Sequence, residues 1–223
     1  MRSTMEVSVV RDILNANDQV AAENRSLLAA RGVTAVNIMA SPGAGKTSVI
    51  AGTAERLPAD LRPGVIEGDL ASSIDTDALL ARGIPAVQIN TGGNCHLDAP
   101  MIRSALPRLP LDAIGVLFIE NVGNLVCPAE FDLGAALAIV VASVPEGHDK
   151  PYKYPGMFAA ADAVLLNKAD LLAYFDFDLD YFRRGLAMVN PDAPLFLVSC
   201  RTGEGMGEWV SWLASRCRVE AGS

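Results

Sequence analysis

The sequence has few cysteines, few histidines, few aromatic side chains and no long apolar run. Its 223 residues include four cysteines and two histidines, and aromatic residues make up 6%. The cysteines, at positions 95, 127, 200 and 217, do not follow the spacing of a secreted disulfide framework. The longest apolar run, residues 134–144, is far shorter than the roughly 20 residues that cross a bilayer, and no apolar core precedes a cleavage site at the N-terminus. We therefore expect a cytoplasmic protein with reduced thiols.

Basic residues are also scarce relative to acidic ones. The chain has 18 Lys and Arg against 26 Asp and Glu, which gives a formal net charge of −8 and a pI near 4.7. This balance argues against a polybasic protein that binds nucleic acid or a membrane surface, because a net negative field repels phosphate groups. Hydrophobic residues make up 51%, which excludes a disordered chain and supplies a core that needs no disulfides. Any anion must therefore be held by local geometry.

Apolar segments alternate with helical ones along most of the chain. The first helical segment, residues 8–31, is amphipathic and ends at Gly32; its apolar residues are Val10, Ile13, Leu14, Val20, Ala21, Leu27 and Leu28. The segments expected to form strands are residues 33–39, 64–67, 86–90, 114–120, 138–143, 163–167 and 195–199. Several are continuously apolar, which is typical of strands covered on both faces. The alternation predicts an α/β fold with a mostly parallel sheet of about seven strands between helices, formed by residues 1–223 as a single domain.

A glycine-rich segment follows the first predicted strand and matches the phosphate-binding pattern G-x-x-x-x-G-K-[ST], except that Ala40 stands at the first glycine position. Gly43 and Gly45 permit the backbone N–H groups to curl around a phosphate. Lys46 supplies a cation for the outer phosphates, and the Thr47 hydroxyl can coordinate Mg²⁺. We therefore expect this loop and the following helix N-terminus to bind a nucleotide. The residues assigned to this site are Gly43, Ala44, Gly45, Lys46, Thr47 and Ser48.

A second motif indicates which nucleotide is bound. The segment 167–170 matches N-K-x-D and ends the sixth predicted strand. The Asp170 carboxylate can accept two parallel hydrogen bonds from N1–H and the exocyclic amine of guanine, a pair that adenine does not offer. The loop after the last predicted strand lies where such proteins place a base-contacting loop. We therefore expect GTP and GDP rather than adenine nucleotides, bound through Asn167, Lys168, Asp170, Ser199 and Cys200.

Two hydrophobic strands end in acidic residues, which is typical of carboxylates that lie near Mg²⁺ in phosphate-loop proteins. Asp69 and Glu120 are these residues. Gly123, three residues after Glu120, is in a position to offer its N–H to the terminal phosphate. We expect Thr47, Asp69 and Glu120 to surround Mg²⁺, and the catalytic set to be completed by Lys46 and Gly123. A solvated strand-end carboxylate is the alternative for each acid.

Three of the scarce cysteine and histidine residues fall in two loops. Cys95 and His96 are adjacent, and Cys127 lies in the loop after residues 114–120. We expect the strands before these loops to be neighbours in the sheet. Two thiolates and an imidazole suit Ni²⁺ or Zn²⁺ and leave an open coordination position. The spacing alone also allows a plainer interpretation, in which the cysteines are small buried hydrophobic residues. We expect Cys200 and Cys217 to be mainly packing residues.

Together these motifs resemble the HypB family, the GTPases of [NiFe]-hydrogenase maturation that help to deliver nickel. The resemblance extends over nearly the whole chain, from the N-terminal helix with Asn17 and residues 23–25 to residues 202–205. The Cys-Pro-His metal motif of the related urease GTPases does not occur. The segments that carry the resemblance are residues 90–92, 95–99, 120–125, 127–134 and 167–170.

The resemblance implies a P-loop NTPase fold of the SIMIBI type and a role for each motif. The phosphate loop would hold phosphates and Mg²⁺ with support from Asp69 and Glu120, and the N-K-x-D segment would read guanine. Cys95, His96 and Cys127 would bind Ni²⁺ or Zn²⁺ at an interface formed by GTP-promoted dimerisation. The implied partners are a second copy of the chain, a HypA-type nickel chaperone and the hydrogenase large-subunit precursor. Movement of the loop after Glu120 would couple the nucleotide state to metal affinity.

The sequence departs from the family pattern in several places. It has no histidine-rich or cysteine-rich N-terminal stretch, so we expect neither bulk nickel storage nor a second N-terminal metal site. Ala78 stands where the family usually has arginine, and His148, where an acid is usual, is expected to be a surface histidine. Asn124, rather than a glutamine, follows Gly123. Because nothing evident orients the attacking water, we expect turnover well below the enzyme median of about 10 s⁻¹.

Two other functions remain open from the sequence. A metal-binding chaperone with nucleotide as a structural ligand would keep metal transfer when Lys46→Ala weakens nucleotide binding. A small-molecule kinase would use the same phosphate loop, but the N-K-x-D segment and the lack of an evident arginine-rich lid argue against it. The favoured interpretation is a metal-regulated GTPase that assists nickel insertion into [NiFe]-hydrogenase.

Overall fold

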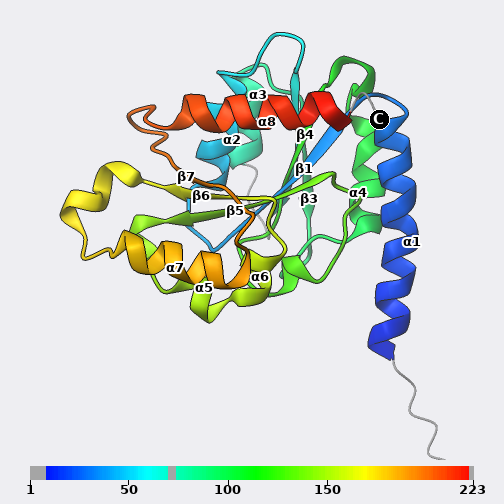
Figure 1. The fold of residues 1–223 in the computed structure, drawn as a ribbon. Coiled ribbons are helices and arrows are strands. Elements are labelled where there is room, and N and C mark those ends of the chain that lie inside the picture. Colours follow the sequence, from blue (N-terminus) through cyan, green and yellow to red (C-terminus); the bar gives the residue numbers. More distant parts are fainter. Residues whose placement is uncertain (1–8, 70–73, 221–223) are drawn as a thin grey trace, which may run out of the picture.

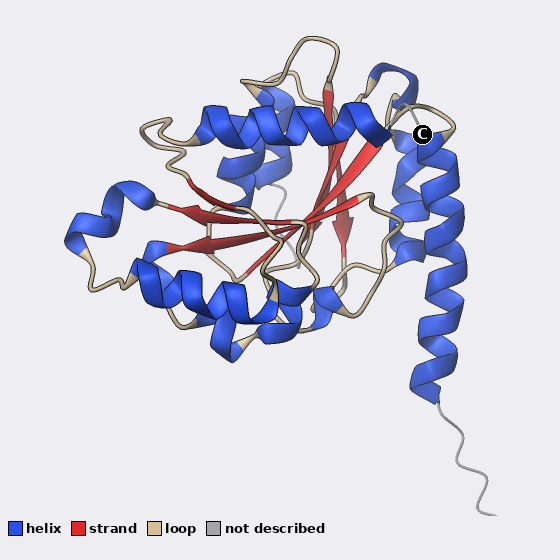
Figure 2. Cartoon of the chain, in the orientation of Figure 1, coloured by secondary structure: helices blue, strands red, loops and turns tan. Residues whose placement is uncertain are grey.

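The computed structural model describes residues 9–69 and 74–220, and these form a parallel sheet between two layers of helices (Figure 1, Figure 2). The strand order is β3-β2-β4-β1-β5-β6-β7, and every pairing is parallel. This confirms the α/β class and the seven strands that the sequence predicts. The strands are β1 (Thr34–Ala40), β2 (Pro63–Asp69), β3 (Ala86–Asn90), β4 (Val116–Glu120), β5 (Leu137–Ser143), β6 (Ala163–Asn167) and β7 (Leu195–Leu197).

Helices cover both faces of the sheet. On one face, α2, α3 and α8 pack over one apolar cluster, and α8 runs across this layer in Figure 1. On the other face, α1 and α4 cover one half and α6 and α7 cover the other half. Most strands are buried on both sides, which is why their sequences are continuously apolar. The helices are α1 (Val9–Ala29), α2 (Lys46–Ala54), α3 (Ile74–Ala81), α4 (Ala99–Ala105), α5 (Lys150–Lys153), α6 (Pro155–Ala159), α7 (Leu179–Val189) and α8 (Met206–Glu220).

The helix expected over residues 8–31 is found as α1, which lies along the edge of the molecule beside α4 (Figure 1). Ala21 and Leu28 are buried in it, and its expected apolar residues at 14, 20 and 27 are half-buried. The side chains of Val10 and Ile13, and residues 1–8 on which the signal-peptide expectation rests, lie outside the described residues. Among the described helices, none is long and apolar enough to cross a membrane.

The parallel arrangement decides where functional residues can meet. Because all strands run in one direction, the end of β2 and the loops after β1, β3, β4 and β6 lie at the same edge of the sheet. Every motif that the sequence analysis selected lies at the carboxyl end of a strand or in the loop that follows. The fold therefore brings segments that are distant in the sequence to one edge.

Candidate nucleotide and metal site

The phosphate loop joins β1 to α2, which begins at Lys46. Gly43 and Gly45 have φ angles of +79° and +96°, in the left-handed region that favours glycine. A Cβ on Gly45 would also lie 2.6 Å from Nδ2 of Asn167, so this position requires glycine on steric grounds as well. Ala40 is the buried last residue of β1 and is not among the described residues with positive φ. Alanine therefore fits the first position of the pattern without strain.

The N-K-x-D segment holds the phosphate loop in place. The Asn167 amide donates from Nδ2 to the Ala44 carbonyl at 2.9 Å, and Lys168 Nζ donates to the Gly43 carbonyl at 2.8 Å. Lys168 is itself in the left-handed region, with φ of 59°. These bonds tie the end of β6 to the loop after β1, so the base-side and phosphate-side segments form one unit.

A cavity of about 430 Å³ lies beside this unit and is large enough for a planar base. Its lining includes the predicted residues Ser48, Asn167, Lys168, Asp170, Ser199 and Cys200. The Asp170 carboxylate accepts a hydrogen bond from Ser199 Oγ at 2.6 Å and one from Arg201 Nε at 3.0 Å. These two donors, Ser199 foremost, hold the pKa of Asp170 below its ordinary value, so the carboxylate is ionised and can accept the guanine protons.

A smaller cavity of about 220 Å³ lies on the other side of the phosphate loop, between the ends of β2 and β4. Lys46, Asp69, Glu120 and Gly123 line it, as the sequence predicts for the terminal phosphate and Mg²⁺. The Thr47 hydroxyl donates to Glu120 Oε1 at 2.9 Å, while the buried Oε2 has no hydrogen-bond partner among the described residues. A buried carboxylate oxygen without a partner, next to a hydroxyl and a second carboxylate, is a donor set that suits Mg²⁺.

Glu67 is a residue of this cavity that the sequence analysis missed. Strands β2 and β4 pair with Glu67 opposite Glu120, so both side chains are directed to the same face of the sheet. Glu67 is 3% exposed and accepts a hydrogen bond from Thr76 of α3. Burial raises the pKa of Glu67, and it raises the pKa of Glu120 to about 7 against the opposing effects of Lys46 and Thr47. The signal in the sequence was a second acidic residue, two positions before Asp69 and on the same face of the strand.

The predicted metal ligands also meet. The Sγ atoms of Cys95 and Cys127 are 3.1 Å apart, and Cys95 Sγ is 3.7 Å from His96 Nδ1. One ligand atom from each of the three residues lies within 4.8 Å of the others. The His96 ring stacks on Phe131, with ring centres 3.9 Å apart. Cys95 is exposed, and the nearby Cys95 thiol is the main cause of the raised pKa of Cys127.

One expectation about these loops is wrong. The sequence predicts that the strands before Cys95 and Cys127 are neighbours, but β2 lies between β3 and β4. The two cysteines meet because their loops extend across the carboxyl end of β2. Strand order depends on long crossover connections, which local sequence patterns do not encode.

The loop after β4 touches both the phosphate loop and the first metal loop. The Asn124 N–H donates to the Ala40 carbonyl at 2.8 Å, and a Cβ on Gly123 would lie 3.0 Å from Pro42. The Asn124 side chain donates from Nδ2 to the Cys95 carbonyl at 3.3 Å. Residues 121–127 therefore connect the phosphate-side cavity directly to the cysteine–histidine cluster.

The remaining predicted residues lie away from these sites. His148 is half-buried: its Nδ1 accepts from the Asp178 N–H at 3.1 Å, and its ring packs on Phe177 and Tyr181. Cys217, on the core-facing side of α8, is 1% exposed, as expected of a packing residue. Ala78 is exposed on α3.

The fold and the site together define a P-loop nucleotide-binding protein of the GTPase class. Residues 34–197 match the family described as "CobW/HypB/UreG, nucleotide-binding domain". The hydrogenase maturation factor HypB of Escherichia coli strain K12 is 50% identical over 217 residues, which cover 97% of this chain and 74% of that protein. The chain belongs to the HypB family, as the motifs in its sequence predict.

Solved structures of the family share this fold. The crystal structure of HypB from Helicobacter pylori in complex with nickel matches with a TM-score of 0.88 at 40% identity, covering 92% of this chain and 97% of that one. HypB from Archaeoglobus fulgidus matches with a TM-score of 0.85 at 38% identity, covering 92% and 100%. The P-loop GTPase fold is therefore confirmed for the described residues.

Proposed function

We propose that this chain is a metal-regulated GTPase that assists nickel insertion into [NiFe]-hydrogenase. The observation that carries the proposal is the short loop from Glu120 to Cys127, which lines the phosphate-side cavity at one end and ends in the cysteine–histidine cluster. Two comparisons support it: the Escherichia coli relative is a hydrogenase maturation factor, and the Helicobacter pylori relative was crystallised with nickel.

In the proposed site, the phosphate loop and Lys46 bind the phosphates of GTP. Asp170 reads guanine, with Ser199 and Cys200 in the loop on the other side of the base cavity. Thr47, Asp69 and Glu120 are the proposed ligands of Mg²⁺, which would neutralise phosphate charge when bound. The cargo metal, Ni²⁺ or Zn²⁺, is assigned to Cys95, His96 and Cys127.

Coupling between the two sites follows from the same loop. We assign the N–H of Gly123 to the terminal phosphate of GTP, and this contact is lost when that phosphate leaves. A shift of Gly123 displaces Asn124, whose side chain holds the Cys95 carbonyl, and moves Cys127 further along the same loop. The spacing of the two thiols, and with it the affinity for the metal, would then differ between the GTP and GDP states.

Slow hydrolysis is part of the proposal. The Asn124 amide is held by both metal loops: Nδ2 donates to the Cys95 carbonyl in the loop after β3, and Oδ1 accepts from the Val126 N–H at 2.9 Å in its own loop. We infer that these two bonds keep Asn124 from orienting the attacking water. We expect a turnover well below about 10 s⁻¹ for the protein without partners. A multiple-turnover GTPase assay that reaches this rate would contradict the expectation.

The proposal includes assembly and location. Cys95 and Val126 are exposed beside the metal cluster, Val126 by 54%, so a second copy of the chain can complete the open coordination position. We propose that GTP and metal promote this homodimer, and that it acts in the cytoplasm as a single-domain protein. Its proposed partners are a HypA-type nickel chaperone and the hydrogenase large-subunit precursor, without nucleic acid or membrane.

Calorimetric titration with Ni²⁺ tests the metal assignment. The wild type is expected to bind nickel, and Cys95→Ala to lose most of this binding because one of three ligands is removed. Cys217→Ala, at a buried position on α8, is the matched control and should bind as the wild type does. Equal nickel binding by the wild type and Cys95→Ala would refute the assignment.

A further inference from the structure

Helix α1 contributes two buried asparagines to the interior of the protein. Asn17 and Asn24 lie on the same face of the helix, because they are two turns apart, and they are 4% and 0% exposed. A buried amide is unfavourable unless its polar atoms are hydrogen-bonded. The partners of these two side chains therefore indicate why they are there.

Each asparagine bonds to Ala99, the first residue of α4 directly after the loop of Cys95 and His96, and to the loop after β4. Asn17 accepts at Oδ1 from the Ala99 N–H at 2.9 Å and donates from Nδ2 to the Asp132 carbonyl at 2.8 Å. Asn24 donates from Nδ2 to the Ala99 carbonyl at 2.9 Å and to the Leu133 carbonyl at 3.2 Å. All four bonds go to backbone atoms, so they hold the position of the backbone and not that of a side chain.

The two loops are those that carry the metal cluster. Ala99 follows Cys95 and His96 closely, and residues 132–133 follow Cys127 in the next loop. The strands before these loops do not pair directly, because β2 separates β3 from β4, so contacts outside the sheet are needed to bring the two loops together. Phe131, adjacent to Asp132, stacks on the His96 ring, so the position of this backbone also orients a ligand.

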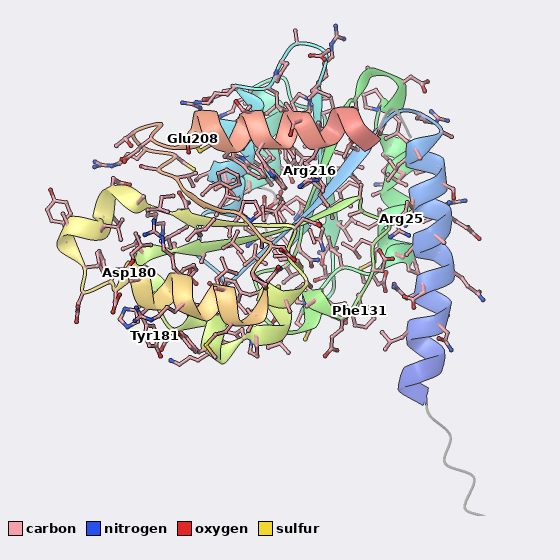
Figure 3. All side chains as sticks on the ribbon, in the orientation of Figure 1. Arg25, Phe131, Asp180, Tyr181, Glu208 and Arg216 are labelled. Atoms are coloured by element: carbon pink, nitrogen blue, oxygen red, sulfur yellow. The ribbon has the colours of Figure 1, made fainter. Side chains whose placement is uncertain are left out.

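Two further contacts show how closely the second loop lies against α1. Gly134 has φ of +81°, and a Cβ there would lie 2.4 Å from the Ala21 carbonyl oxygen. Arg25, labelled on α1 in Figure 3, forms an ion pair with Asp132 at 2.8 Å. Asn24 Oδ1 is buried without a hydrogen-bond partner among the described residues. The contribution of this amide is therefore the two hydrogen bonds that its Nδ2 donates.

We infer that Asn17 and Asn24 are positioning residues of the metal site. They hold the two loops at the separation that brings Cys95, His96 and Cys127 together. The inference rests on the proposed function, because it assigns the asparagines to a metal centre that the proposal assumes. Loss of groups that orient metal ligands typically lowers metal affinity by about 10- to 100-fold, and the lower end of this range is expected for bonds to the backbone near the ligands.

Two variants test this with nickel as the probe. Asn24→Leu keeps the volume but removes both donors, and Asn17→Asp keeps the acceptor for the Ala99 N–H but loses the donor to Asp132. Each is expected to weaken nickel binding about 10-fold or more and to shift the thiolate-to-nickel absorption band, while the affinity for GTP stays within about twofold of wild type. Glu23→Gln, which removes a 3.5 Å ion pair between α1 and Arg103, is the control and should change neither.

A metal-free measurement separates this inference from the proposed function. Dibromobimane joins two neighbouring thiols, and the linked cysteines are located by peptide mass spectrometry. Both asparagine variants should form the Cys95–Cys127 cross-link more slowly than wild type. If wild type binds no nickel but the variants still cross-link slowly, the proposed function fails and the loop positioning stands. Wild-type rates of cross-linking and wild-type nickel affinity in both variants, or an equal loss of nickel and GTP binding, would overturn the inference.

Discussion

The substitution Glu120→Gln tests whether the ionised Glu120 carboxylate destabilises the folded protein in the absence of ligands. Burial raises the pKa of Glu120 from 4.5 to about 7, and Lys46 and Thr47 only partly oppose it. A shift of this size corresponds to about 3 kcal/mol of differential stability between the protonated and ionised forms. Glutamine cannot ionise, so the variant lacks this contribution at every pH.

The raised pKa of Glu120 determines whether the free energy of unfolding rises or falls with pH. Between about pH 4.5 and about pH 7 the folded protein keeps a proton that the unfolded chain releases, so the free energy of unfolding of the wild type falls as pH rises through this window. Asp149 and Asp170 have lowered pKa values and act below this window, with the opposite sign. Glu67 acts in the same direction as Glu120 and is present in both proteins.

Urea unfolding of the ligand-free protein at about pH 5 and about pH 8 measures the effect. From about pH 5 to about pH 8, the free energy of unfolding of the wild type is expected to fall by up to about 3 kcal/mol more than that of Glu120→Gln. Glu204→Gln, at an exposed loop position, should follow the wild type. Parallel pH dependence of wild type and Glu120→Gln would refute the reasoning, because it would show that the buried carboxyl group has an ordinary pKa.

Three further predictions concern the nucleotide and the core. Lys46→Ala should weaken GTP binding by about 100-fold, since it removes the phosphate-loop cation, and should abolish any effect of GTP on nickel affinity; undisturbed nickel transfer by this variant would favour the structural-ligand alternative. Asp170→Asn should weaken GTP by about 100-fold and improve the binding of XTP, whose base has a carbonyl in place of the guanine amine, as measured by competition with a fluorescent nucleotide. Trp209→Ala should lower the free energy of unfolding by about 4 kcal/mol in urea, because the indole is fully buried and donates to Thr53 Oγ1 at 2.8 Å; a loss below that of Trp212→Ala, which is half-buried, would contradict this.

The sequence predicts the secondary structure well where burial is complete. Strands such as β1 and β6 are buried along their whole length, so their apolar runs locate them within one residue. The last strand is shorter than expected, ending at Leu197 rather than 199, because its ladder with β6 extends only that far. Strand order could not be read from the sequence, since it depends on which distant segments pack together.

Some residues of the candidate site could be predicted from the sequence and others could not. The phosphate loop and the N-K-x-D segment are continuous in the chain and chemically distinctive, so their residues could be assigned directly. Glu67 was missed because its role depends on the register of β2 with β4, which sets it opposite Glu120. The roles of Asn17 and Asn24 depend on hydrogen bonds to backbone atoms far along the chain, and local sequence patterns do not predict such bonds.

In the proposed mechanism, the nucleotide state of the protein changes its affinity for nickel. The most direct measurement is a calorimetric titration of the wild type with Ni²⁺ in the presence of saturating GDP, repeated with a non-hydrolysable GTP analogue. We expect dissociation constants that differ by about fivefold or more, with the reciprocal effect of nickel on analogue binding. Equal nickel affinity in the two nucleotide states would contradict it.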